Sequence, residues 1–251
     1  MLSKLDLKLN RESLQITKNH YDIIVGVAEK YKLDECYNSR NLEFKNCINY
    51  LKNKFNKEGQ VDYIWDDLLL CIDGLRYSIA SVLFYKKLGL TPIVAGYNPS
   101  NIDWLFCFFL DDGYSRLYST WNRVGNFLNV FFEEIKNDKN IYFDKVIDKI
   151  NKDCYGNNYY FKLKKFRDKE YKIIINPYRN EIIHNQTSYY AIIKNLVEKS
   201  DESEILEKQQ KDRDEKPQFL AEQYQFLYNS LENIINLVKI QFPNEVNKDG
   251  V

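Results

Sequence analysis

The chain has 251 residues, of which 44% are hydrophobic, enough to form a sizeable core. It contains only 9 glycines and 5 prolines, too few for the frequent turns of a β-sandwich or β-barrel, so a mainly helical protein is expected. The 36 basic residues balance 36 acidic ones, so any nucleic-acid or membrane partner would have to be bound by a local patch.

The beginning of the sequence predicts neither a secretory signal nor a membrane anchor. Met1 to Arg11 alternates charged residues with leucine, and the longest purely apolar run, Trp104 to Leu110, is far shorter than a membrane span. The cysteines are odd in number, widely spaced and free of any CxxC pair. We therefore expect a cytoplasmic protein without a membrane contact, a metal or another cofactor, in which the thiols stay free: Cys36, Cys47, Cys71, Cys107 and Cys154.

Helical periodicity is the main signal in the first third of the chain. Two short patterns, near 21–31 and 42–55, predict an N-terminal helical segment over 1–60 that packs on a larger helical bundle over 61–251, together forming one compact domain. The region 61–88 predicts a long helix with an apolar stripe facing the core. Its members are Ile64, Leu68, Leu75, Ile79 and Val82, with Cys71 filling the gap.

A loop and a second long helix follow. Glycine and proline are concentrated in 89–99, which predicts a loop. Ser100 or Asn101 can cap the next helix, which should reach residue 135 and could be interrupted near Gly113. This helix is rich in aromatic residues, so we expect it to be central and buried; the alternative for Trp121 is stacking on a ligand.

The region 159–172 alternates aromatic and basic residues after a short helix over 142–151 and a turn over 153–158. One interpretation is a solvated helix face whose aromatic residues lie in the core. The other is a surface for single-stranded RNA, since such surfaces combine cations with aromatic platforms. The RNA-binding candidates are Lys162, Lys164, Lys165, Arg167 and Tyr171.

The last third of the chain contains one weak strand signal and one strong helix signal. Lys172 to Asn176 is the only β-like run, and 198–217 is a charged stretch without expected core residues, either an exposed helix or a linker. The final helix has an apolar stripe with alternating spacings of four and three, formed by Leu220, Tyr224, Leu227, Leu231, Ile234 and Val238. These elements together predict an all-α multi-helix bundle.

The chain has two histidines, His20 and His184, and only His184 lies in a chemically suggestive setting. Asn176 and Pro177 are suited to the first positions of a helix, whose first two turns would then carry Arg179, Asn180 and His184. Asn180 and His184 are four residues apart and share a helix face, which the long Arg179 side chain can also reach. A cation, an amide and an imidazole at a helix N-terminus can bind a phosphodiester.

The pattern Arg179-Asn180-x-x-x-His184 resembles the signature of the HEPN superfamily, all-helical domains common in prokaryotic toxin, abortive-infection and CRISPR-associated ribonucleases. The resemblance implies an all-α HEPN-type bundle, here with extra N-terminal helices, that cleaves RNA without a metal at a composite site formed by a homodimer. It carries over Arg179, Asn180 and His184 as catalytic residues. It also implies a toxin or phage-defence effector with a possible antitoxin or sensor protein. Gln186 stands where nucleotidyltransferase-paired relatives usually have Tyr, so that particular kind of partner is not implied.

Two alternatives remain open from the sequence. One is a non-catalytic HEPN-type module that binds RNA, a nucleotide or a protein, and the other is a helical protein with no ligand. A di-iron site based on Glu181-x-x-His184 would need a second such motif, but Thr17 stands three residues before His20.

Overall fold

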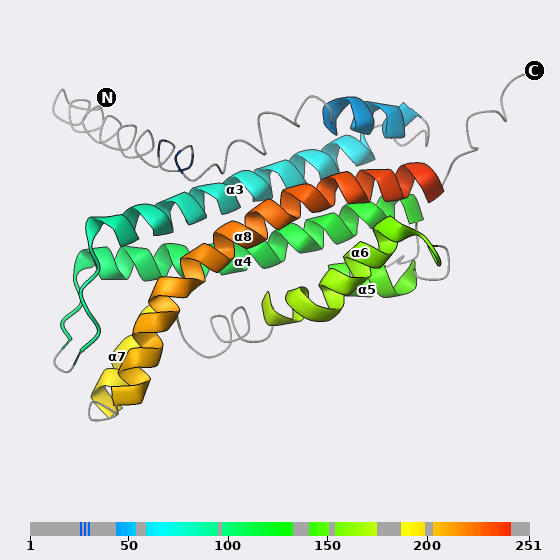
Figure 1. Cartoon of the computed structure of the whole chain (residues 1–251). Coiled ribbons are helices and arrows are strands. Elements are labelled where there is room, and N and C mark those ends of the chain that lie inside the picture. The colour runs from blue at the N-terminus through cyan, green and yellow to red at the C-terminus, as the bar shows by residue number, and fades with distance from the viewer. Residues whose placement is uncertain are drawn as a thin grey trace, which may run out of the picture.

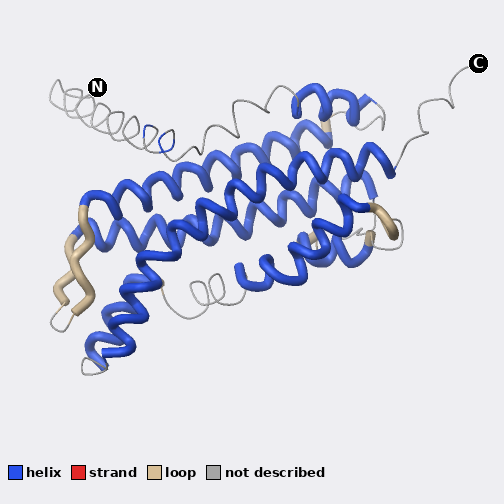
Figure 2. Tube along the Cα trace, viewed as in Figure 1, coloured by secondary structure: helices blue, strands red, loops and turns tan. Residues whose placement is uncertain are grey.

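The structure is a computed structural model that describes residues 26, 28, 30, 44–53, 59–94, 97–132, 141–150, 154–174, 187–198 and 203–241. All regular structure in these residues is helical, as Figure 2 shows, which confirms the predicted all-α fold. The run Lys172 to Ile174 is also helical, so the β-like signal there was wrong for these residues. The elements are α3 (Gln60–Leu88), α4 (Asn101–Phe132), α5 (Phe143–Lys149), α6 (Asn158–Phe166), the π-helix η2 (Arg167–Tyr171), α7 (Ser188–Glu198) and α8 (Ser203–Gln241).

Three long helices form the body of the bundle. Figure 1 shows α3 and α4 side by side in opposite directions, with α8 running along both in the direction of α4. Helices α5 and α6 pack near the C-terminal ends of α4 and α8, whereas α7 lies beside the beginning of α8. Helix α4 contacts α3, α5, α7 and α8, so it is the central element that the sequence predicted.

The core stripe of α3 differs slightly from the predicted one. Seven positions alternate spacings of four and three and are all buried, which is the pattern of a helix packed along its length. Leu68, Leu75, Ile79 and Val82 belong to the stripe as predicted, but Ile64 and Cys71 lie at its partly exposed flank. Their places are taken by Trp65 and Ile72, so the prediction was wrong by one residue in the first half of the helix.

Helix α4 begins with a reciprocal cap and continues without a break. The Ser100 N–H and hydroxyl donate to Asp103 Oδ2, at 2.8 and 2.7 Å, and the Asp103 N–H donates to Ser100 Oγ at 3.3 Å. The interruption that the sequence allowed near Gly113 does not occur. A Cβ at Gly113 would lie 3.0 Å from Leu220 Cδ1, so this glycine lets α8 approach α4 closely.

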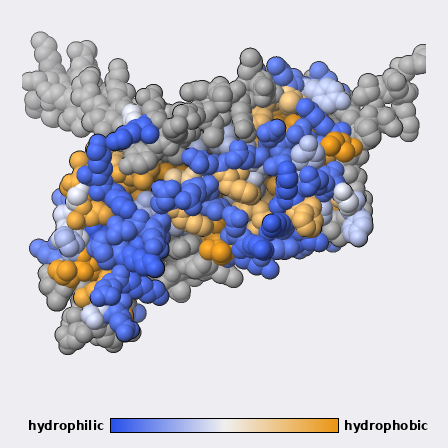
Figure 3. Space-filling model, in the orientation of Figure 1, coloured by the Kyte–Doolittle hydropathy of each residue, from blue (hydrophilic) through white to orange (hydrophobic). Residues whose placement is uncertain are grey.

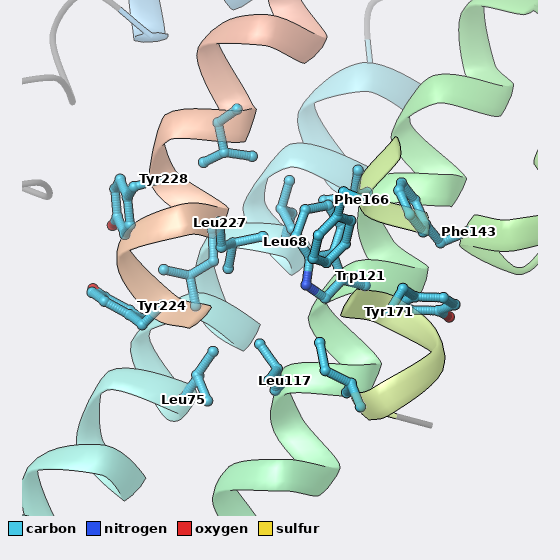
Figure 4. Packing of buried hydrophobic residues seen from close by; sticks show 14 of the residues in the cluster. Leu68, Leu75, Leu117, Trp121, Phe143, Phe166, Tyr171, Tyr224, Leu227 and Tyr228 are labelled. Carbon is cyan, nitrogen blue, oxygen red and sulfur yellow. The ribbon is translucent and has the colours of Figure 1, made fainter. Parts of the chain in front are cut away.

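Trp121 is fully buried in the centre of an aromatic cluster (Figure 4). Its ring centroid lies 4.2 Å from that of Phe166 and 4.8 Å from that of Phe143. Phe166 in turn stacks on Phe226 of α8, at 4.6 Å. The cluster therefore joins α4, α5, α6 and α8, and Trp121 is a core residue and has no face open to a ligand.

Helix α8 combines a confirmed prediction with a correction. All six stripe residues from Leu220 to Val238 are buried, as predicted. The charged stretch before them belongs to the same helix, which starts at Ser203 and contains Pro217. Leu206 and Arg213 of this stretch are buried, so the expectation that it contributes no core residues was wrong.

Helix α3 is the one helix among the described residues that is long and apolar enough to cross a membrane. Just over half of its most apolar window, 56%, is buried inside the bundle. In the face drawn in Figure 3, hydrophilic residues predominate and apolar ones form separate patches. Four cysteines are described and all are free thiols: Cys47, Cys71, Cys107 and Cys154. Burial raises the pKa of the Cys107 thiol to about 12, which keeps it protonated and unreactive.

Candidate functional site

Arg179, Asn180 and His184 lie outside the described residues, and so does the whole segment 175–186. The described chain resumes immediately on both sides of this segment. It ends at Ile174, just after η2, and begins again at Thr187, just before α7. The contacts of these two flanks define where the motif segment is attached to the bundle.

The upstream flank is attached through Tyr171. This side chain is only 1% exposed, and its hydroxyl donates to Asn122 Oδ1 of α4 at 3.1 Å. The Tyr171 ring also stacks on Tyr118, one turn earlier on α4, with centroids 6.3 Å apart. Asn122 Oδ1 accepts a second hydrogen bond from the Phe143 N–H at 3.3 Å, so one amide oxygen joins α4, α5 and η2.

The downstream flank is attached through Ser188, the first residue of α7. Its N–H donates to Asp111 Oδ2 of α4 at 3.0 Å, and its hydroxyl donates to the other carboxylate oxygen. Thr187 caps the same helix by accepting the Tyr190 N–H at its hydroxyl oxygen, 3.3 Å away. A carboxylate at a helix N-terminus is favoured both by the free N–H groups and by the helix dipole. Ser188 follows His184 by four residues, so this contact fixes the chain close to the motif.

The two attachment points lie on one face of α4. Asp111 and Asn122 are eleven residues apart, which is close to three complete helical turns and about 16 Å along the axis. The described residues on the two sides of the motif segment, Tyr171 and Ser188, therefore contact the same side of the central helix.

The predicted RNA-binding residues divide into two groups. Lys162 and Lys165 are exposed on α6, and Lys164 is partly exposed. Arg167 is largely buried, with its guanidinium 2.7 Å from Asp148 and 2.8 Å from Asp168. Because Arg167 is held by two carboxylates and Tyr171 is buried, neither presents a surface to RNA in this structure. Tyr171 follows Tyr160 by three helical turns, a spacing that already indicates the core face.

Asp67 and Asp112 both have partners within the bundle. Asp67 forms an ion pair with Arg123 across α3 and α4. Asp112 accepts from Arg116 Nε at 2.6 Å and from the Ser78 hydroxyl at 2.5 Å. No group of three or more potential metal-binding side chains occurs among the described residues.

A buried ion pair between α4 and α8 was not foreseen from the sequence. Arg213 Nη2 lies 2.9 Å from Asp103 Oδ1, and both side chains are buried. Arg213 Nη1 also donates to the Thr91 carbonyl at 2.9 Å, while the Thr91 N–H and hydroxyl donate to Asp103. This network, which we call the Asp103 network (Thr91, Ser100, Asp103 and Arg213), fastens the 89–99 loop to both helices. The only sequence signal was the cap, since Asp103 stands three residues after Ser100.

The Asp103 network also lowers the pKa of the Asp103 carboxyl group. Burial alone would raise the pKa of Asp103, but the hydrogen bonds from Thr91 and Ser100 and the charge of Arg213 outweigh it. The pKa of Asp103 therefore lies below its usual value, and the carboxylate is ionised at neutral pH.

The described helices form an all-α bundle. The HEPN_Cthe2314-like HEPN family matches residues 93–239, more than half of the chain, and the chain belongs to this family. The matched range begins in the 89–99 loop and ends near the end of α8, and it contains positions 179–184. No curated protein and no solved structure matches the chain.

Proposed function

We propose that the protein is a metal-independent endoribonuclease whose active site is formed by two copies of the chain. The observation that carries the proposal is family membership over 93–239, a range in which Arg179, Asn180 and His184 form the only histidine-containing motif. A further support is the attachment of both flanks of the motif segment to one face of α4, through Asp111 and Asn122.

The proposed reaction uses the ribose 2′-hydroxyl as the nucleophile. His184 of one subunit removes the 2′ proton, and the 2′ oxygen attacks the adjacent phosphorus. The bond from phosphorus to the 5′ oxygen breaks, and protonated His184 of the second subunit gives its proton to that leaving oxygen. Arg179 stabilises the negative charge of the phosphorane, and Asn180 orients His184 or holds a phosphate oxygen. The products are a 2′,3′-cyclic phosphate and a free 5′-hydroxyl, and no metal takes part.

The homodimer is needed because each chain supplies one motif histidine, while the reaction needs a base and an acid. A surface suited to a second copy lies on α4, where Trp104 and Phe108 are 48% and 51% exposed and stack on each other at 5.6 Å. They precede Asp111 by seven and three residues, so all three side chains lie near one face of the helix. A twofold contact there would bring the two Ser188 attachments, and with them the two motifs, near each other.

The direct test is cleavage of single-stranded RNA by the purified full chain in the presence of a chelator. We expect His184→Ala to abolish cleavage, His20→Ala to retain it, and the product to carry a 2′,3′-cyclic phosphate. Mixed dimers of wild type and His184→Ala should also be inactive, because each active site needs both imidazoles. Undiminished cleavage by His184→Ala would remove the proposal.

The dimer has its own test. Trp104→Glu with Phe108→Glu should convert the protein to monomers in sedimentation experiments and abolish cleavage. Leu70→Glu, at a position of α3 that is also exposed, is the matched control and should do neither. A monomeric wild-type protein that still cuts RNA would exclude the composite site.

The proposed physiological role is that of a cytoplasmic toxin or phage-defence effector, restrained by an antitoxin or sensor protein. It rests on the HEPN resemblance. We expect expression of the wild-type chain in a bacterial host to arrest growth and His184→Ala to be tolerated. Binding of RNA, a nucleotide or a protein without any cleavage would instead favour the alternative of a non-catalytic HEPN-type module.

A further inference from the structure

Helix α6 has two chemically different faces. Tyr160, Leu163 and Phe166 point into the bundle and are buried. The opposite face carries Phe161 followed by three lysines at Lys164, Lys165 and Lys169, three, four and eight residues further along. These spacings keep the ring and the three cations on one side of α6 and η2.

This outer face lines a groove of about 640 Å³, which we call the α6 groove. Tyr155, in the turn before α6, lines the groove together with Phe161. Tyr155 is 90% exposed and Phe161 is 65% exposed, so the folded chain buries little of either ring. Two aromatic rings that contribute little to the core are open to a ligand.

The charge of the α6 groove is mainly positive. Asp168 is its one acidic lining residue, and Arg167 binds that carboxylate at 2.8 Å. Lys165 and Lys169 have no ion pair with any residue in the described part of the chain. An anionic ligand with flat rings is therefore the best chemical match.

We infer that the α6 groove binds a single-stranded stretch of RNA, with bases stacked on Tyr155 and Phe161 and phosphates beside Lys164, Lys165 and Lys169. The inference rests on the proposed function and deepens it by naming the form of the substrate. Single strands are preferred because their unstacked bases expose both faces, whereas the bases of a duplex are stacked on each other. Lys169 precedes Arg179 by ten residues, so the groove ends shortly before the motif segment along the chain.

The stacking part is tested by fluorescence anisotropy with a labelled single-stranded oligoribonucleotide. The full chain with His184→Ala is used as the background, so that binding is measured without cleavage. Tyr155→Ala with Phe161→Ala should lower the affinity by about tenfold or more, because a base–aromatic stack contributes about 1–3 kcal/mol. Tyr63→Ala removes an equally exposed ring on α3 and is the control that should change nothing.

The charge part is tested by the salt dependence of the same binding. Each phosphate contact on a single strand contributes about 0.7 to the slope of log affinity against log salt. Lys165→Gln with Lys169→Gln should therefore reduce that slope by about 1.4. Lys45→Gln with Lys208→Gln removes two exposed lysines elsewhere and should leave the slope as it is.

Three results would overturn the inference: unchanged affinity in the double aromatic variant, equal or tighter binding of a duplex of the same sequence, or no RNA binding at all by the His184→Ala chain. The last result would point to a protein partner for the groove. These outcomes are separable from those of the proposed function. A wild-type chain that binds single strands through the α6 groove but never cuts them would refute the proposed nuclease activity and support the inferred binding site.

Discussion

The two ends of α4 are held in different ways. Near its beginning, Asp103 is fixed by directional contacts, among them a 2.9 Å ion pair with Arg213 and a 2.7 Å hydrogen bond from Thr91. In its second half, Trp121 is surrounded by the rings of Phe143 and Phe166. One end therefore relies on charge and geometry, and the other on apolar area.

This difference matches what each end has to hold. The Asp103 network fastens a loop, which has few apolar side chains of its own and needs specific partners for its backbone. The aromatic end joins helices whose apolar faces can be buried against each other. We expect the aromatic end to dominate stability at every pH and the polar end to set the position of the loop.

Trp121→Ala should have the largest effect. Removing a fully buried tryptophan should lower the free energy of unfolding by about 3–5 kcal/mol, because the surrounding rings cannot fill the cavity. Urea denaturation followed by circular dichroism measures the change. Tyr63→Ala, which truncates a 75% exposed ring, should shift it by less than about 0.5 kcal/mol. Similar losses in both variants would contradict the contrast.

Arg213→Met should have the second largest effect. It should lower the free energy of unfolding by about 3 kcal/mol, because it leaves the Asp103 carboxylate buried without its counter-charge. The loss should stay at the lower end of the range for broken buried pairs, since Thr91 and Ser100 still donate to Asp103. Adding Asp103→Leu should recover part of the stability, as the unpaired charge is then gone. A double variant that is no more stable than Arg213→Met alone would show that the unpaired charge was not the cause.

The same contrast separates what the sequence could predict from what it could not. The stripe from Leu220 to Val238 was predicted correctly because apolar spacing records which helix face is buried. Arg213 and Asp103 are 110 residues apart, and no periodicity links two charged residues across the chain. The sequence therefore predicted no core residues in the stretch around Arg213, although an exposed helix was one of its two interpretations.

The candidate site shows the same limit. The sequence indicated Arg179, Asn180 and His184 by their identity and spacing, and these remain predictions. It could not indicate that Asp111 and Ser188 would meet, since 77 residues separate them. The sequence placed Tyr171 with the RNA-binding candidates because the composition of a segment does not show which of its residues face the core. Tyr155 lies before the region 159–172 and was not considered, and Phe161 was not singled out within that region, since the exposure of a single ring becomes apparent only in the folded chain.

The two glycines of α4, Gly113 and Gly125, differ in how closely neighbouring helices pack against them. A Cβ at Gly125 would lie 2.9 Å from the backbone of Phe143, which cannot move without displacing α5. Gly125→Ala should therefore lower the free energy of unfolding by about 1–3 kcal/mol. At Gly113 the nearest atom is the end of the Leu220 side chain, which can rotate, and alanine is the better helix former. Gly113→Ala should thus cost clearly less in the same denaturation experiment, and the reverse order would contradict the packing described.

Asp111→Ala should change stability by only about 1 kcal/mol, the usual loss when a helix cap is removed. If the proposed function holds, cleavage should fall by about tenfold to a hundredfold, because Ser188 and the motif segment lose their attachment to α4. The measurement is single-turnover cleavage at saturating RNA, with Asp112→Ala as the neighbouring control. Equal cleavage by Asp111→Ala and wild type would show that this attachment does not position the motif.

The smallest effect should be the pH dependence of the Asp103 network. Because the pKa of Asp103 is lowered in the folded protein, its contribution is complete above the unfolded value of about 3.9 and is lost as pH falls through the folded pKa. The contribution is modest because burial opposes the hydrogen bonds that lower the pKa. The stability difference between wild type and Asp103→Asn should therefore be constant from pH 7 to about pH 5 and shrink below about pH 4. The stability difference between wild type and Trp121→Ala should not change over that range, because this substitution removes no titrating group. If both differences shrank in parallel, the two ends of α4 would not differ in the way described.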